Sequence, residues 1–152
     1  MIKPIAIATA FCGTLDILFA IILTVLFGRE IGNMLRYVAS GPFPPATDMG
    51  AGGAILGLIV HFTLMAIMVA AFVIAVSRRP SLNRNPILAG LIYGLITYVV
   101  MNWIVVPLRF DTPLPPKALS IATQLFAHIV LVGIPTALIT AHNQKSVANA
   151  SQ

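Results

Sequence analysis

The stretch IAIATAFCGTLDILFAIILTVLF (residues 5–27) is apolar apart from a few small polar residues and one acid, Asp16, near its centre. A helix needs about 20 consecutive apolar residues to cross a bilayer, so this stretch predicts a first transmembrane helix. A carboxylate at the bilayer centre costs roughly 2.5–3.5 kcal/mol on insertion scales. That cost predicts a polar partner for Asp16 elsewhere in the chain.

The composition of the whole chain agrees with a membrane protein. Of its 152 residues, 59% are hydrophobic and 9% are charged, whereas a soluble domain carries about 25% charged residues. Three further apolar stretches occupy residues 49–76, 87–106 and 118–141. We therefore expect an all-α integral membrane protein, with residues 1–152 forming one transmembrane domain of four helices in an antiparallel bundle, and the lipid bilayer as its partner.

Two prolines bear on the ends and the straightness of these helices. Pro107 directly follows the third apolar stretch, and Pro135 lies within the fourth. Proline lacks a backbone N–H and its ring clashes with the preceding helical turn. The sequence therefore predicts that Pro107 ends the third helix and that Pro135 kinks the fourth.

The loop at residues 28–48 contains a helical pattern of its own. Apolar residues recur there at helical spacing, with polar residues largely off that stripe, and Gly41 followed by prolines is a typical helix stop. The apolar positions are Ile31, Met34, Leu35 and Val38. We expect a short amphipathic helix over residues 29–40 that lies on the membrane surface, with a lid over the bundle as the alternative.

The basic residues act as signals of orientation. The net charge is +5, but the cations flank the apolar stretches, so we do not expect nucleic acid as a partner. Five cations fall on the side of the two termini and four on the other side: Lys3, Arg78, Arg79, Arg84 and Lys145 against Arg29, Arg36, Arg109 and Lys117. The excess of positive charge predicts that both termini are cytoplasmic.

Two pairs of glycines, Gly53 with Gly57 and Gly90 with Gly94, have the GxxxG spacing. This spacing lets two helix backbones approach closely in a membrane. We expect both pairs to pack helices together. Because four helices are few for a solitary transporter, a homodimer through one of these faces, or a partner in a membrane complex, is also expected.

The ionisable residues inside the apolar stretches form the candidate site. His61 lies near the middle of the second stretch and His128 near the middle of the fourth, at the depth of Asp16 in the first. In a simple four-helix bundle the first helix neighbours the second and the fourth, so Asp16 could reach either histidine. We expect a buried polar core of Asp16, His61 and His128, with Asn102 and Gln124 as secondary members.

Several functions are compatible with such a core. A carboxylate beside an imidazole can relay protons, which favours proton-linked or ion transport or the binding of a small partner. The alternatives are a metal site formed by Asp16, His61 and His128, a redox protein with haem held between the two histidines, and a structural or accessory subunit in which the polar core joins helices. No cofactor is expected from the residue pattern. We expect no enzyme, because the sequence contains no nucleophile–base pair at a membrane surface, no phosphate-binding glycine loop and no acidic pair.

Short pieces of sequence occur in a characteristic order along most of the chain: Gly13-Thr14-Leu15-Asp16, Ala39-Ser40-Gly41, Gly57 with His61, Met101-Asn102 before Pro107, and His128 with Gly133 and Pro135. In this order the chain resembles small four-span bacterial inner-membrane proteins of the YagU-like group. The resemblance implies a multi-pass protein of the bacterial inner membrane. It transfers no functional residue.

Overall fold

The computed structural model describes the backbone of residues 1–150 and the side chains of residues 1–144. All regular structure in these residues is helical. Four helical stretches are long and apolar enough to cross a membrane by length and composition: Ile2–Leu26, Gly50–Arg78, Pro86–Phe110 and Ala118–Gln144. The four predicted long apolar helices are therefore confirmed, and the third extends four residues beyond its predicted end at residue 106.

Two of the long stretches are continuous α-helices, and two contain a π-helical segment. The continuous ones are α1 (Ile2–Leu26) and α3 (Gly50–Arg78). The third consists of α4 (Pro86–Val99), the π segment η3 (Val100–Val105) and α5 (Val106–Phe110). The fourth consists of α6 (Ala118–Phe126), the π segment η4 (Ala127–Gly133) and α7 (Ile134–Ala150). Single 3₁₀ turns, η1 (Pro44–Asp48) and η2 (Pro80–Asn83), precede α3 and α4.

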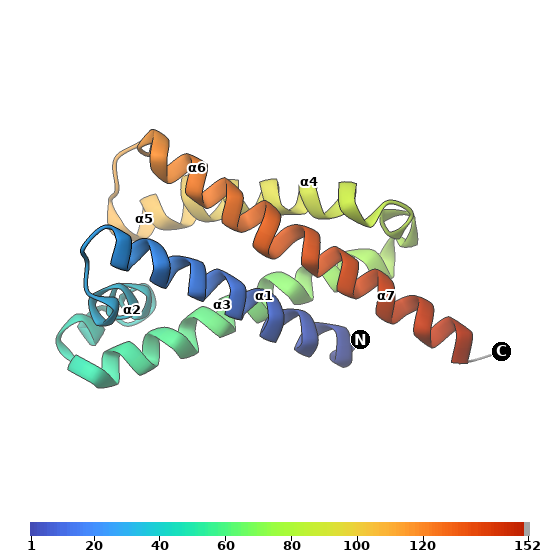
Figure 1. The fold of residues 1–152 in the computed structure, drawn as a ribbon, viewed down its shortest axis with the longest axis horizontal. Coiled ribbons are helices and arrows are strands. Elements are labelled where there is room, and N and C mark those ends of the chain that lie inside the picture. The colour runs from blue at the N-terminus through green and yellow to red at the C-terminus, as the bar shows by residue number, and fades with distance from the viewer. Residues whose placement is uncertain (151–152) are drawn as a thin grey trace.

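The fourth stretch lies between α1 and α4. Helix α1 contacts α3 on one side and η4 and α7 on the other, while α4 packs against η4 and α7. The first helix thus neighbours the second and the fourth, as expected. The centre between α1, α3 and η4 is filled by a compact cluster of apolar residues: Ala8, Cys12, Met65, Val69, Val73 and Val132. Figure 1 shows the N-terminus and the end of α7 at the same end of the molecule.

The prediction that Pro107 ends the third helix is wrong, because the helix continues through Pro107 to Phe110. It ends instead at Asp111, whose φ of 49° lies in the left-handed region. In both interrupted helices the π segment ends just before the proline, Pro107 or Pro135. A π turn has room for one more residue, so it accommodates the proline ring and the carbonyl that lacks its usual N–H donor. The disturbance predicted at Pro135 takes this form.

Both glycine pairs pack against other parts of the same chain. A Cβ atom at Gly57 would overlap the Leu35 carbonyl oxygen, and one at Gly53 would overlap the carbonyl oxygen of Ala46. On α4, a Cβ at Gly94 would lie 2.5 Å from the His128 carbonyl oxygen, and one at Gly90 would lie 2.6 Å from the Cα of Ile134. The chain's own backbone therefore covers both faces, so a homodimer would have to use a different surface from the one expected.

The helix of the first loop, α2 (Ile31–Ser40), packs on α3 instead of lying apart on a membrane surface. Its Leu35 and Ala39 side chains are buried, because the glycines of α3 let the two backbones meet. Figure 1 shows α2 at one end of the molecule, close to α1 and α3. Of the four residues in the predicted apolar stripe, Leu35 is buried, Met34 and Val38 are half-buried, and Ile31 is exposed.

The end of α5 holds the C-terminal end of α2. The Arg109 guanidinium donates to the Ser40 carbonyl oxygen at 2.7 Å and also to that of Gly41. Beside this contact the rings of Tyr37 and Phe110 stack with 4.3 Å between their centroids. Partial burial raises the pKa of the Tyr37 phenol. The first loop is thus fixed to both α3 and the third helix.

We predict that Gly57→Ala lowers the thermal stability of the protein, whereas Gly52→Ala does not. The methyl group at position 57 would overlap backbone, and overpacking of this kind costs about 1–3 kcal/mol. Nothing lies within 4 Å of a Cβ at Gly52, which is on the same helix, so the control reports only the gain in helix propensity. The melting temperatures of both variants in mild detergent measure the difference. A Gly57→Ala variant as stable as Gly52→Ala would contradict the close packing of α2 on α3.

Candidate functional site

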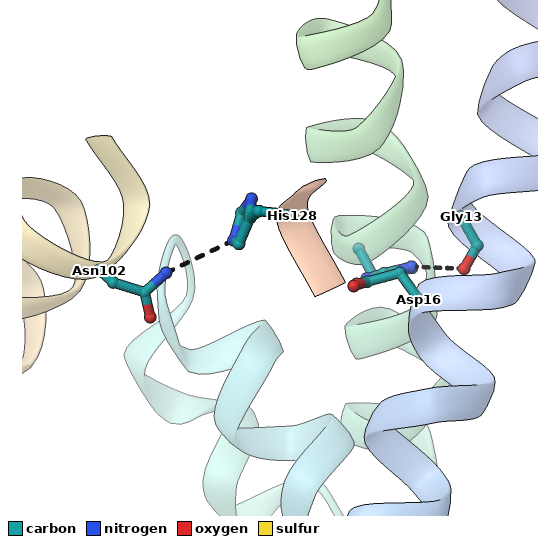
Figure 2. Close-up of polar contacts among 5 residues, drawn as sticks. Gly13, Asp16, Asn102 and His128 are labelled. Carbon is teal, nitrogen blue, oxygen red and sulfur yellow. Dashed lines mark hydrogen bonds and ion pairs between the residues drawn. The ribbon is translucent and has the colours of Figure 1, made fainter. Parts of the chain in front are cut away.

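Asp16 and His61 face each other across the contact between α1 and α3. The Nδ1 atom of His61 lies 3.9 Å from a carboxylate oxygen of Asp16. The other ring nitrogen, Nε2, lies 2.9 Å from the carbonyl oxygen of Gly13, one turn earlier on α1. Figure 2 shows the contact to Gly13 beside the Asp16 carboxylate. The prediction that Asp16 could reach His61 is therefore met by the geometry.

The contact with Gly13 fixes which nitrogen of His61 carries a hydrogen. A backbone carbonyl only accepts hydrogen bonds, so Nε2 must be the donor. The Nδ1 atom then faces Asp16 with either a lone pair or a second hydrogen. One proton can consequently reside on Nδ1, giving an ion pair, or on the Asp16 carboxyl, giving a neutral pair. The separation of 3.9 Å between these two atoms suits an ion pair and is too long for a direct hydrogen bond.

Asp16 is less buried than the sequence predicted. Its side chain is 27% exposed and that of His61 is 11% exposed, so the expected fully buried aspartate is wrong. The reason is that the apolar cluster around Cys12 and Met65 fills the centre of the structure. The carboxylate is left at the contact between α1 and α3, outside this cluster, where it is partly exposed.

His128 belongs to a different cluster, with Thr97 and Asn102. Its Nδ1 lies 3.2 Å from the Thr97 hydroxyl and its Nε2 lies 3.4 Å from the Asn102 amide nitrogen. An amide nitrogen only donates, so Nε2 accepts and Nδ1 carries the hydrogen that it donates to Thr97. The Thr97 hydroxyl in turn donates to the Gly94 carbonyl oxygen at 3.0 Å. Both ring nitrogens of this buried histidine are therefore satisfied while it is neutral.

The structure thus divides the predicted polar core in two. One part is Asp16 with His61, and the other is His128 with Asn102; Figure 2 shows the two parts as separate contacts. The prediction that all three ionisable residues share one core is wrong, because close packing at Gly94 turns His128 toward α4. Gln124 is half-buried on α6, and among the described residues its side chain has no hydrogen-bond partner.

The geometry does not favour the metal and haem alternatives. Within residues 1–144, no three side chains of His, Cys, Asp or Glu come close enough together to hold a metal ion. Haem ligation by two histidines needs a free nitrogen on each ring, directed at one iron. Here Nε2 of His61 is bonded to Gly13, and both nitrogens of His128 contact α4 and η3. These side chains therefore provide neither a three-ligand metal site nor two free histidine nitrogens for haem.

Two partners at these sites were missed from the sequence. The Gly13 carbonyl is a backbone group, so no side-chain pattern indicates it. Thr97 could have been found, because it lies three residues after Gly94 and residues three apart share one face of a helix. A polar residue next to a glycine that permits close approach is well placed to contact the neighbouring helix.

We expect Thr97→Val to destabilise the protein by about 0.6–1.7 kcal/mol, the range measured for hydrogen bonds between membrane helices. The change removes the acceptor of the His128 Nδ1–H group and nearly preserves the side-chain volume. Thr63→Val is the matched control, because Thr63 also bonds a carbonyl of its own helix but is exposed. Unfolding in mixed micelles measures both variants. Equal stability of the two would show that His128 does not depend on Thr97.

Comparison with known proteins adds no further assignment. The chain matches no family model, and neither the curated proteins nor the solved structures include one that is similar to it. The resemblance to the YagU-like group therefore stays a prediction from the sequence. The account of the site depends on the geometry of Asp16, His61 and Gly13.

Proposed function

We propose that this protein crosses a membrane four times, as an antiparallel bundle, and that its Asp16–His61 pair carries a proton in the proton-linked transport of an ion or small solute. Four long apolar helices support the membrane placement. The observation that carries the function is the position of His61, whose Nε2 is bonded to Gly13 while its Nδ1 faces the Asp16 carboxylate. This arrangement leaves one proton free to move between two fixed groups.

The environment of the pair suits proton exchange. Ionisable residues within membrane helices commonly mark ion or proton pathways, and imidazole exchanges protons near neutral pH. Asp16 is half-buried, so the carboxyl group can be reached from outside the protein core. His128, by contrast, has both nitrogens satisfied, so its proposed role is to join α4 to the fourth helix.

The proposed location is the bacterial inner membrane, with both termini in the cytoplasm. The resemblance to four-span bacterial proteins supports the membrane, and the excess of Lys and Arg on the side of the termini supports the orientation.

We predict that Asp16→Asn abolishes proton movement while the fold is retained. Asparagine has nearly the same shape as aspartate but cannot accept or release the shared proton. The purified protein is reconstituted into vesicles that contain a pH-sensitive dye, and a potassium diffusion potential drives protons across the membrane. Wild-type protein should change the internal pH faster than protein-free vesicles, and Asp16→Asn should match the protein-free rate.

Asp111→Asn is the control for this experiment, because it makes the same chemical change in the loop after α5. It should behave as the wild type does. Asp16→Asn vesicles that move protons as fast as wild-type vesicles would contradict the proposed role of the pair.

A second candidate function is an accessory subunit of a membrane complex. The observation that favours it is the 27% exposure of the Asp16 side chain at mid-helix, which a polar group of a partner subunit could cover. In this case replacing both members of the pair by leucine should leave the chain itself folded, because apolar residues can replace a buried ion pair without loss of stability, but should remove the polar contact with the partner.

The double variant Asp16→Leu with His61→Leu separates the two functions. An accessory role with a partner at Asp16 predicts a folded variant that crosslinks less to its complex than the wild type does, as measured in native membranes when one residue at the contact between α1 and α3 is replaced by a photoreactive amino acid. Proton-linked transport predicts a folded variant that has lost Asp16-dependent proton movement. A folded variant with unchanged assembly and unchanged proton movement would contradict both.

A further inference from the structure

Two cavities lie side by side at the end of the molecule where the N-terminus and the end of α7 lie. The first, of about 270 Å³, opens between α1, α3 and α7; its lining is mostly apolar but includes the polar side chains of Ser77, Asn143 and Gln144. The second, of about 460 Å³, lies between α1 and α7, with Ile7, Leu138 and Ile139 in its wall. Lys3 and Asn143 line both cavities, so the two share one wall.

The lining combines a cation and amide groups with an apolar floor. Lys3 supplies the ammonium group where the cavities meet. The Gln144 side-chain oxygen accepts a bond of 2.8 Å from the Asn83 amide of η2, so its own NH₂ group is left as a donor. Val73 and Pro4 contribute apolar surface to the first cavity, and the wall of the second contains Lys3, His142 and Asn143 as well as three aliphatic residues. A ligand that fits both must have an anionic, hydrogen-bond-accepting group next to a hydrocarbon portion.

Charge at this end of the chain favours an anion. Lys3, Arg78, Arg79 and Arg84 lie in the first turn of α1 and around the connection between α3 and α4. The four acids of the sequence are Asp16, Glu30, Asp48 and Asp111, and none of them belongs to this end. Basic pockets between transmembrane helices on the cytoplasmic side are known to bind the headgroups of anionic lipids.

We propose that these cavities bind one anionic phospholipid, with its phosphate at Lys3 and Gln144 and part of an acyl chain along Ile7 and Leu138. The inference rests on the proposed placement of the four helices across a bilayer, which puts this end of the helices at headgroup depth. The lipid would fill the gap between α1 and α7 and so hold the first turn of α1 in place.

Native mass spectrometry of the full chain, released from mild detergent, tests the proposal. The protein is incubated with phosphatidylglycerol or with phosphatidylcholine, and the fraction of lipid-bound protein is measured at each lipid concentration. We expect one phosphatidylglycerol molecule bound in preference to phosphatidylcholine. Lys3→Gln should weaken that binding by about fivefold, which corresponds to the loss of one lysine near an anionic surface.

Arg84→Gln is the matched control, because it removes the same charge at the same end but does not line either cavity. It should leave the preference for phosphatidylglycerol unchanged. A second variant, Ser77→Phe, fills the first cavity without changing charge and should also weaken binding. Equal weakening by Lys3→Gln and Arg84→Gln would overturn the proposal, because surface charge alone would then explain the preference.

Inorganic phosphate distinguishes the two sources of a phosphate group. A lipid site predicts that added phosphate, at the same ionic strength as a chloride control, does not displace phosphatidylglycerol, whereas displacement would mean a site for a free anion and would overturn the lipid assignment. Asp16→Asn protein should bind phosphatidylglycerol as the wild type does. The experiments can therefore contradict the proposed lipid site and the proposed proton pair independently of each other.

Discussion

Close approach of neighbouring helices at glycines holds this structure together and decides where its polar groups meet. At Gly13 the side of α1 is flat, and a Cβ there would lie 2.7 Å from the Phe62 ring of α3. This approach brings the ring of His61, next to Phe62, within 2.9 Å of the Gly13 carbonyl. At Gly94 the same kind of contact brings the fourth helix onto α4 and places His128 beside Thr97. Both histidines take these positions because Gly13 and Gly94, which lie opposite them, are glycines and have no side chain.

The two histidines have different chemistry although both lie near the middle of a helix. His128 donates a hydrogen bond to Thr97 and accepts one from Asn102, so both nitrogens of the neutral ring have partners. It cannot exchange a proton without breaking one of these bonds. His61 has a hydrogen-bond partner for only one ring nitrogen, because Nε2 is bonded to the Gly13 carbonyl oxygen while Nδ1 faces the Asp16 carboxylate at 3.9 Å. A low-dielectric surrounding makes each of these contacts stronger and each unpaired polar group more costly. This difference is the basis of the two proposed roles, in which His128 joins helices and the Asp16–His61 pair carries a proton.

The length of the apolar stretches was enough to predict the four long helices, because a run of about 20 apolar residues is typical of a helix that crosses a membrane. The pairing of Asp16 with His61 was one of two possibilities in the sequence, and depth could not choose between them. The choice depends on rotation about the helix axis, and the π segments before Pro107 and Pro135 change the angle per residue on which face assignments rely. The glycine pairs were recognised as packing sites, but spacing cannot tell whether the covering backbone belongs to the same chain. For Gly57 it is Leu35 of the first loop.

The central claim is that His61 donates through Nε2 to Gly13 and keeps Nδ1 for the proton that it shares with Asp16. Nitrogen-15 NMR of histidine-labelled protein in lipid bilayers tests it directly, with the His61 signals assigned by their loss in a His61→Gln variant. We expect Nε2 to carry a hydrogen at every pH at which the protein is folded, and the Nδ1 signal of the Asp16→Asn variant to differ from that of the wild type. A His61 ring that holds its hydrogen on Nδ1 and leaves Nε2 bare would contradict the account, because a bare nitrogen cannot bond to the Gly13 carbonyl.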